Sequence, residues 1–475
     1  MEENGGPASE PTERYSPPRR LLRALARRFP RAHIAFNFLR AKTIHYLLRA
    51  RDLVRRPLAP RRLSATWRWL AAETTRFAAL RREPRLTVAV EVGAFWEPLT
   101  GIGWYLYRLL EHLADRDDVR LRLHGPSIVA SPDLPEPRVP PPTGAALELV
   151  RIEVPDGLVV PRGLLIKVLR KAEPLLIALE GNRVLFAPNY VLPRRFRLAG
   201  GARVATIHDL GWRKVPWTLR PETLVELSES LEHALFEATR LITVSETVRG
   251  ELEELGLADP GRVTAIHHGP GQLAEVTPGE LPDHVPESYG LHVGTLEPRK
   301  NILGLLAAWD RLHELVADPP TLVLCGRFGW KADAIRAAVE RATAAGRAVH
   351  LGYVTEEELA ALYRRARVVV FPSLYEGFGL PAIEAQQAGA PLVASDIPVL
   401  REVAADGALD AAPDRPDELA ATIARLLAEP TLAREVAERG RRRAGELSWT
   451  RSARQTLEVL ARAAGDAGAR NGRAA

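Results

Sequence analysis

The sequence predicts an α/β protein with two Rossmann-like domains, each built on a parallel sheet. From residue 86 onward, short apolar segments alternate with segments of helical periodicity, a pattern typical of βαβ units. At 368–371 a continuous apolar run is followed by a glycine turn and a helix start, as expected for a strand buried on both faces. Residues 268–287 are rich in Gly and Pro without periodicity, which indicates a linker between the domains.

Length and cysteine content set the broad class. The 475 residues correspond to about three domains of roughly 150 residues each. Cys325 is the single cysteine, so no disulfide can form within the chain, which fits a reducing cytoplasm. No apolar run approaches the roughly 18 residues of a membrane span, and the start of the chain lacks the pattern of a signal peptide. We therefore expect a cytoplasmic protein.

Residues 1–85 read as a basic, partly helical extension. They hold 20 Lys and Arg against 7 Asp and Glu, a net charge of +13, whereas the remaining chain holds 45 against 52, a net charge of −7. Arginines alternate with Leu, Phe and Trp at helical spacing, for example at 21–29 and 67–77. This pattern favours peripheral contact of residues 14–85 with the inner face of an anionic membrane. The alternative is a helical hairpin that packs on the body.

The two domains are predicted from two series of strands. We expect strands at 86–92, 183–186, 202–207, 240–244 and 262–266, and then at 289–294, 321–327, 350–354, 368–371 and 391–396. Helices are expected at 104–113, 302–315, 416–428, 430–445 and about 450–464. Thr355 and Glu358 form a capping-box pattern that should open a further helix ending at Arg365.

A glycine-containing loop, TGIG at 100–103, follows the first strand. Gly101 and Gly103 have the spacing of a G-x-G motif, but Leu106 stands where the dinucleotide fingerprint needs its third small residue. The broken fingerprint argues against NAD as a cofactor.

The strand–turn–helix motif at 367–396 carries the strongest functional signal. Gly377 and Gly379 free the backbone for a tight turn, and Pro381 stands where a helix should begin. Backbone N–H groups and the positive end of a helix dipole should therefore point at an anion. Glu376 and Glu384 flank the turn, and carboxylates of this kind suit the hydroxyls of a sugar and a ribose. The alternative is that both residues are structural, tying up amides or complementing the helix dipole.

The string E-G-F-G-L-P-x-x-E at 376–384 resembles the E-x7-E signature of retaining glycosyltransferases of family 4, which have the GT-B fold. The resemblance implies that Glu376 binds the donor sugar and Glu384 the nucleotide ribose. It also places the turn between them at the donor, through the residues Gly377, Phe378, Gly379 and Leu380.

Other strings resemble motifs of the same family. TIHDLGWRKVPWTL at 206–219 and TVSETVRGEL at 243–252 resemble its first-domain motifs, which implies that His208 reaches the donor sugar. The TGIG string resembles the loop over the donor diphosphate, which places Gly103 there. The backbone near Val354 corresponds to the site of the nucleotide base.

GTLEPRKN at 294–301 resembles the turn that holds the donor phosphates in mannosyltransferase-like members. The resemblance implies that Lys300 binds the diphosphate. Many members carry an Arg where this chain has Thr295, and Arg299 is expected to supply the second cation instead. The residues expected to act in catalysis are thus His208, Glu376, Arg299 and Lys300.

The resemblance covers about residues 86–464 and implies the GT-B fold with a helical N-terminal extension. The expected units are a basic extension at 1–85, an acceptor-side Rossmann-like domain at 86–270, a linker at 271–287, a nucleotide-sugar-binding Rossmann-like domain at 288–448, a terminal helix at 449–466 that crosses back to the first domain, and a disordered tail at 467–475.

The expected function is transfer of a sugar from a GDP- or UDP-sugar to a glycan or lipid-linked acceptor with retention of configuration, in cell-surface polysaccharide or glycolipid synthesis. No cofactor or metal is expected, because the single D-x-D string, at 115–117, lies at a predicted helix end. The alternative of similar architecture is a nucleotide-sugar epimerase. Binding of nucleic acid is not expected, because the body is acidic and no zinc or RNA-binding motif is present.

Overall fold

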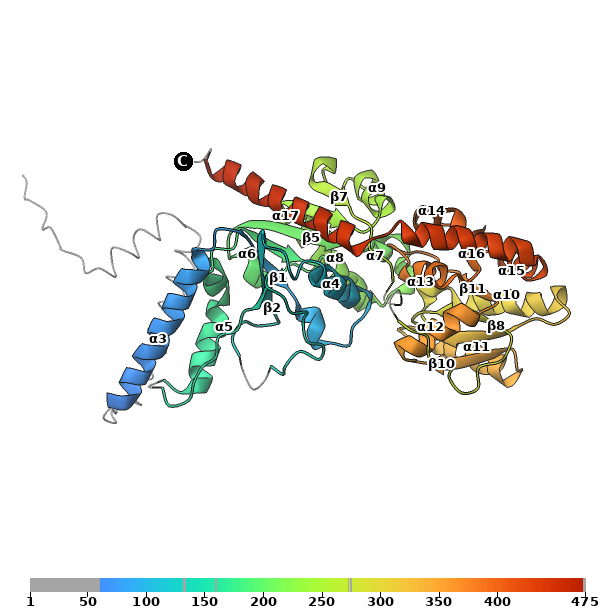
Figure 1. Cartoon of the computed structure of the whole chain (residues 1–475), viewed down its shortest axis with the longest axis horizontal. Helices are drawn as coiled ribbons and strands as arrows, with labels where there is room; N and C mark the ends of the chain where they lie inside the picture. The colour runs from blue at the N-terminus through green and yellow to red at the C-terminus, as the bar shows by residue number, and fades with distance from the viewer. Residues whose placement is uncertain (1–59, 131–133, 159, 272, 274–275, 473–475) are drawn as a thin grey trace, which may run out of the picture.

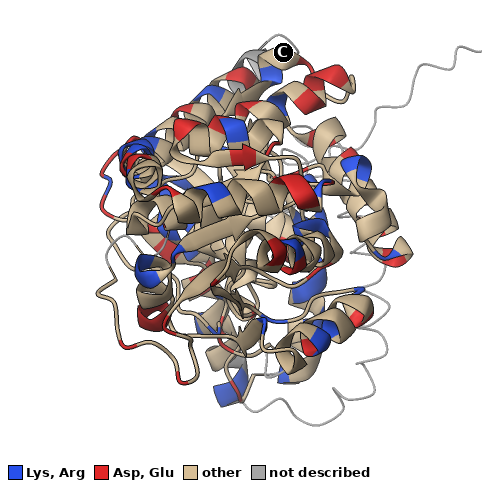
Figure 2. Cartoon of the chain, turned by 90° about the vertical axis from the view of Figure 1, so that its right-hand side faces the viewer, with Lys and Arg blue, Asp and Glu red and all other residues tan. Residues whose placement is uncertain are grey.

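The computed structural model describes residues 60–472 except 131–133, 159, 272 and 274–275. It contains two parallel sheets in two bodies that follow one another along the chain (Figure 1). This confirms the prediction of two Rossmann-like domains. Charged residues lie mostly on the helices and loops around the second sheet (Figure 2). This is expected because helices cover both faces of a parallel sheet, so its strands are apolar.

The first sheet has the order β3-β2-β1-β4-β5-β6-β7. Its strands are β1 (Leu86–Glu91), β2 (Val119–His124), β3 (Leu147–Leu149), β4 (Val184–Ala187), β5 (Ala202–Ile207), β6 (Arg240–Thr243) and β7 (Val263–Ala265). The main helices of this part are α4 (Gly101–Glu111), α5 (Arg162–Leu179), α6 (Arg194–Arg197), α7 (Gly211–Lys214), α8 (Pro221–Glu237) and α9 (Glu246–Glu254).

The second sheet has the order β10-β9-β8-β11-β12-β13. Its strands are β8 (Tyr289–Val293), β9 (Thr321–Cys325), β10 (Ala348–Gly352), β11 (Val368–Phe371), β12 (Leu392–Ser395) and β13 (Leu409–Ala411). Its helices are α10 (Ile302–Leu315), α11 (Asp333–Ala344), α12 (Glu356–Arg365), α13 (Leu380–Ala388), α14 (Pro398–Ala404), α15 (Pro416–Ala428) and α16 (Pro430–Gly445).

The last helix, α17 (Trp449–Gly472), returns to the first sheet. Its apolar face, including Leu457, Leu460 and Ala463, is buried in the same core as the strands of that sheet. The helix continues past residue 466, so the expected disordered tail at 467–475 is wrong for its part up to Gly472. Residues 467–472 contain no Pro that would end the helix, although Gly468 and Gly472 are weak helix formers.

Some local predictions need correction, whereas others are confirmed. Helix α4 begins at Gly101, so the TGIG string forms its first turn instead of a loop before it. Strand β10 begins at Ala348, earlier than expected, because Ala348 and Val349 pair with strand β9. The capping box of Thr355 and Glu358 is present at the start of α12.

The described part of the N-terminal extension includes helix α3 (Pro60–Arg81), which contains the helical spacing noted at 67–77. Phe77 is buried in a core that it shares with α5, and the ring of Trp69 donates to the carbonyl of Glu153 at 3.0 Å. Trp67 and Leu70 are exposed. The helical stretches expected within 19–56 lie outside the described residues. Within the described part of the chain, no helix is both long and apolar enough to cross a membrane.

Candidate active site

The glycine turn after β11 brings the two domains together. Gly379 has φ +95°, a conformation that favours glycine, and it precedes the first residue of α13. A Cβ on Gly377 would lie 1.7 Å from the carbonyl oxygen of His208, so only glycine permits this approach. Because His208 follows β5 of the first sheet, the turn closes against the first domain at the carboxyl ends of both sheets. Ligands bind at that edge in open α/β folds.

A compact ion cluster lies beside the turn. The carboxylate of Glu376 accepts hydrogen bonds from Arg299 at 2.8 Å and from Lys300 at 2.5 Å. Burial alone would raise the pKa of Glu376, but the two cations outweigh it and lower this pKa to about 2. Burial lowers the pKa of Lys300, and the neighbouring Glu376 opposes that shift. The cluster thus unites three of the four residues expected to act in catalysis.

Arg299 is held from two sides. Its guanidinium also donates to the carbonyl of Tyr375 at 3.0 Å and pairs with Glu297 at 3.0 Å. Glu297 is almost completely buried, and this burial raises its pKa. Arg299 therefore fixes the backbone of the glycine turn as well as the charge of Glu376.

Lys300 and Arg299 belong to a single 3-10 turn, Pro298–Lys300, that leads from β8 to α10. Asn301 follows in the left-handed conformation, which lets α10 begin at once. Two cations in the first strand–helix turn of the domain, next to the N-terminus of α13, are an arrangement that stabilises an anion.

Glu384 lies in α13 and is mostly buried. The hydroxyl of Tyr363, in α12, donates to its carboxylate at 3.0 Å. The linker covers the other side, because a Cβ on Gly271 would lie 2.1 Å from Cγ of Glu384. Glu384 is therefore close to the turn in sequence and space but lies beneath the linker, and it does not join the ion cluster of Glu376.

His208 contacts the turn through its backbone, and its ring points elsewhere. Its Nε2 donates to the carbonyl of Pro188 at 2.8 Å, and its ring lies edge-on to Tyr105 at 4.9 Å. Burial lowers the pKa of this imidazole, so the ring is neutral at pH 7. Phe378 of the turn packs on the ring of His268 at 4.6 Å.

The remaining predicted residues lie on neighbouring elements. Gly103 is buried in the first turn of α4, the helix whose Tyr105 contacts the ring of His208. Val354 follows β10, next to the exposed Tyr353, and is partly buried against the second core. Leu380 is the first residue of α13.

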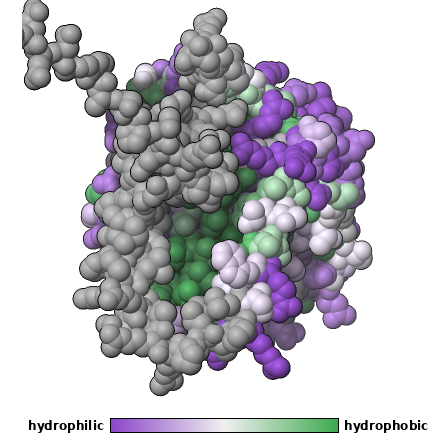
Figure 3. Space-filling view, turned by 90° about the vertical axis from the view of Figure 1, so that its left-hand side faces the viewer, coloured by the Kyte–Doolittle hydropathy of each residue, from purple (hydrophilic) through white to green (hydrophobic). Residues whose placement is uncertain are grey.

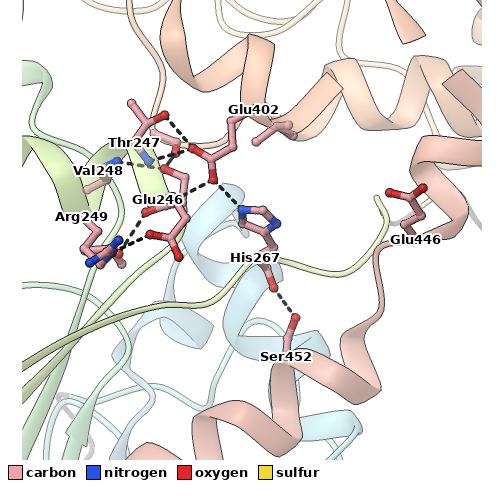
Figure 4. Close-up of polar contacts among 12 residues, drawn as sticks. Glu246, Thr247, Val248, Arg249, His267, Glu402, Glu446 and Ser452 are labelled. Atoms are coloured by element: carbon pink, nitrogen blue, oxygen red, sulfur yellow. Dashed lines mark hydrogen bonds and ion pairs between the residues drawn. The ribbon is translucent and has the colours of Figure 1, made fainter. Parts of the chain in front are cut away.

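The sequence analysis did not identify several residues that connect the two domains. The hydroxyl of Tyr375 donates to Glu251 of α9 at 2.7 Å and accepts from the backbone N–H of Leu210 at 2.9 Å. The hydroxyl of Ser245 donates to the carbonyl of Gly377 at 2.8 Å. Glu402, drawn in Figure 4, binds the start of α9. Their partners are more than a hundred residues away in sequence, so no local pattern points to them.

Carboxylates in the described part of the chain are not grouped for a metal ion. No set of three or more His, Cys, Asp and Glu in that part is placed to hold one. In the D-x-D string, Asp115 and Asp117 are exposed, and Arg116 between them pairs with Asp118 at 2.7 Å.

Comparison with known sequences gives three relevant matches. The family model described as glycosyl transferases group 1 matches residues 282–443. The O-antigen chain mannosyltransferase B of Escherichia coli is 33% identical over 389 residues, which are 76% of this chain and 96% of the relative. The serotype-specific mannosyltransferase WbdA of Escherichia coli is 29% identical over 314 residues, which are 62% of this chain but 38% of that longer protein.

Solved structures share the architecture. The sucrose-phosphate synthase of Thermosynechococcus elongatus superposes with a TM-score of 0.60 at 24% identity, over 80% of this chain and 99% of that one. HepE of Anabaena, in complex with UDP and glucose, superposes with a TM-score of 0.57 at 17% identity, over 79% of this chain and 99% of HepE. WaaG, a glycosyltransferase of lipopolysaccharide biosynthesis, superposes with a TM-score of 0.56 at 15% identity, over 78% of this chain and 99% of WaaG. At these identities the similarity concerns the fold.

Proposed function

Because this chain belongs to the glycosyl transferases of group 1 and is a glycosyltransferase, we propose that it transfers mannose from a nucleotide-activated donor to a growing cell-surface polysaccharide. The names of two relatives, O-antigen chain mannosyltransferase B and the mannosyltransferase WbdA, support this choice of sugar and product. The epimerase alternative gains no support from any of these matches.

The observation that carries the proposal is the ion cluster of Glu376, Arg299 and Lys300 beside the glycine turn. When the bond between sugar and diphosphate breaks, negative charge grows on the leaving group, and preorganised cations and N–H groups stabilise it. In our proposal the donor phosphates take the cations from Glu376, whose carboxylate then accepts hydrogen bonds from the sugar hydroxyls. Glu384 binds the ribose after the linker at Gly271 has moved aside, and the sugar keeps its anomeric configuration.

The test is a screen of GDP-mannose against UDP-, ADP- and TDP-sugars by thermal shift, followed by product analysis. We expect GDP-mannose to raise the melting temperature most, and a mannosylated acceptor to form with the anomeric configuration of the donor. Conversion of the nucleotide sugar itself in the absence of acceptor would identify an epimerase instead.

Transfer is expected to proceed without a divalent cation. Arg299 and Lys300 both pair with Glu376 beside the glycine turn, and in the proposal they neutralise the diphosphate in place of a metal. Turnover should be unchanged in EDTA, with untreated enzyme and enzyme supplemented with Mg²⁺ or Mn²⁺ measured in parallel. Loss of activity in EDTA that is restored by Mn²⁺ would contradict this prediction.

We also propose that the N-terminal extension attaches the enzyme to the inner face of an anionic membrane, where a lipid-linked acceptor is presented. Helix α3 displays Trp67, which is 69% exposed, and Leu70, together with several arginines. Figure 3, which views the molecule from the end at which α3 lies, shows an area of hydrophobic residues next to hydrophilic ones. Each basic residue near an anionic surface contributes about 1 kcal/mol of binding.

The double variant Trp67→Glu, Leu70→Glu is expected to float less than wild type with anionic liposomes, because it replaces the exposed apolar side chains of α3 with charges that the lipid repels. Phe236→Glu is the matched control, since Phe236 in α8 is 88% exposed but far from the extension in sequence. Binding of the wild type should weaken at 1 M salt, where the Debye length is about 3 Å. Equal flotation of all three proteins, or none by wild type at low salt, would refute the membrane role of α3.

A further inference from the structure

The carboxylate of Glu402 joins three parts of the chain that are far apart in sequence. It accepts hydrogen bonds from the backbone N–H groups of Glu246 and Thr247, both at 2.7 Å, and from the hydroxyl of Thr247 at 2.6 Å. The ring of His267, in the segment that follows β7, lies 2.5 Å from the same carboxylate. Figure 4 shows these groups converging on Glu402 from α9 and from the segment after β7.

The contact crosses from one domain to the other. Glu402 lies in α14, directly after β12 of the second sheet, whereas Glu246 and Thr247 form the first turn of α9 in the first domain. N–H groups of a first helical turn have no partner within the helix, and a carboxylate there also meets the positive end of the dipole. Glu402 therefore supplies, from the second domain, the anion that the start of α9 requires.

The same turn of backbone reaches the active site. The hydroxyl of Ser245, which precedes α9, accepts from the N–H of Val248 at 3.2 Å and donates to the carbonyl of Gly377 at 2.8 Å. A segment of four residues thus contacts Glu402 on one side and the glycine turn on the other. Displacement of the start of α9 would also shift the hydroxyl of Ser245, which donates to the carbonyl of Gly377.

Glu402 is itself held rigidly. Arg443 of α16 donates to the carbonyls of Glu402 and Val403, both at 3.0 Å, and so fixes the end of α14 within the second domain. The hydroxyl of Ser452 in α17 donates to the carbonyl of His267. The carboxylate of Glu402 therefore belongs to a fixed helix of the second domain. Its hydrogen bonds to α9 form only when the two domains lie in this relative position.

We propose that Glu402 is a positioning residue for sugar transfer, which holds the first domain against the second through the start of α9. Through Ser245 it keeps the glycine turn in the place where Gly377 meets the backbone of His208. This inference rests on the proposed function for its kinetic consequence, but not for its structural one.

The position of Glu402 predicts that its loss affects turnover and nucleotide binding differently. The groups proposed to bind the nucleotide, Arg299, Lys300 and Glu384, all belong to the second domain, so they stay in place when the contact to α9 is lost. The donor must nevertheless be enclosed by both domains to react, because orientation against the acceptor and exclusion of water depend on closure. Loss of Glu402 should therefore lower kcat and leave nucleotide affinity unchanged.

The experiment compares Glu402→Gln with wild type and with Glu435→Gln, a control at an exposed position on α16. We expect kcat of the Glu402 variant to fall at least about tenfold, which corresponds to about 1.4 kcal/mol. The Kd of the nucleoside diphosphate, measured by calorimetry, should not change. The radius of gyration from X-ray scattering with saturating nucleotide should be larger than that of wild type and of the control.

A folded Glu402→Gln protein with the kcat and radius of gyration of wild type would overturn the proposal. So would a loss of nucleotide affinity as large as the loss of kcat, because that indicates general damage to the second domain. If Glu402→Gln does not fold, Thr247→Val decides: removal of one hydroxyl should lower kcat about threefold at constant Kd, and an unchanged kcat would refute the role. Absence of transfer by the wild type would instead refute the proposed function. The comparison of radii of gyration would then still test whether Glu402 holds the two domains together.

Discussion

Replacement of Lys300 by alanine is expected to lower kcat/KM for sugar transfer by about 10²–10³-fold while the protein stays folded. Loss of a single preorganised donor to developing negative charge costs about 2.7–4 kcal/mol in enzymes that stabilise an oxyanion, and Lys300 is proposed to meet a comparable charge. Its side chain is fixed in advance by the ion pair with Glu376. The fold should survive, because Arg299 continues to neutralise that carboxylate.

The measurement is kcat/KM with the donor found in the screen, together with a thermal unfolding curve for each protein. Lys167→Ala is the control, because Lys167 is exposed on α5 and lies outside the ion cluster. An unchanged kcat/KM in folded Lys300→Ala protein would show that the leaving diphosphate is stabilised by other groups.

Replacement of Glu376 by glutamine is expected to act mainly on kcat, whereas the same change at Glu384 should mainly raise KM for the donor. Glu376 is proposed to hold the sugar whose bonding changes in the transition state. Glu384 is proposed to hold the ribose, whose contacts are equal in the ground and transition states. The two variants have the same chemistry and lie in the same motif, so each is the control for the other. The reverse pattern would mean that the two roles are exchanged.

Glu376 also contributes to the dependence of stability on acid pH. The pKa of Glu376 is lowered to about 2 in the folded protein, below its ordinary value of 4.5. Its ion pairs therefore stabilise the fold above the unfolded pKa, and this contribution is lost as the pH falls toward 2. Between those two values, unfolding of Glu376→Gln should depend less steeply on pH than unfolding of wild type.

The strand–turn–helix around Glu376 was predictable because its determinants are local. Gly377, Gly379 and Pro381 each restrict or free the backbone at their own position, and the apolar run before them specifies the strand. The pairing of Glu376 with Lys300 was not predicted from spacing, although both residues were identified separately. The site could therefore be located in the sequence from its glycines, whereas the pairing of its charged side chains could not.

Strand β2 shows why other parts could not be read from the sequence. Its segment VRLRLH alternates arginine with leucine, which suggests a half-exposed strand at best. Arg122 is nevertheless buried, because it donates to the carbonyls of Glu180 and Leu80 and to the side chain of Asn182. A buried charge is acceptable only when such partners exist, and they come from other segments.

His208 also depends on partners from distant segments. Its ring donates to the carbonyl of Pro188 and its backbone carbonyl meets Gly377, whereas the contact with the donor sugar that the resemblance implies stays a prediction. Glu402 and Tyr363 were missed for a related reason, since an isolated Glu or Tyr in a helix has no local signature. Tertiary partners decide the function of such residues.

The return of α17 to the first sheet has a consequence for the order in which the protein is made. Residues 86–265 leave the ribosome before α17 does, yet the apolar face of α17 belongs to their core. Folding during synthesis usually proceeds domain by domain from the N-terminus. Here the first domain stays incomplete, with apolar surface uncovered, until the second domain has been synthesised and the final helix emerges. A truncation just before Trp449 would therefore expose the core of the first domain, although the first sheet ends almost two hundred residues earlier in the sequence.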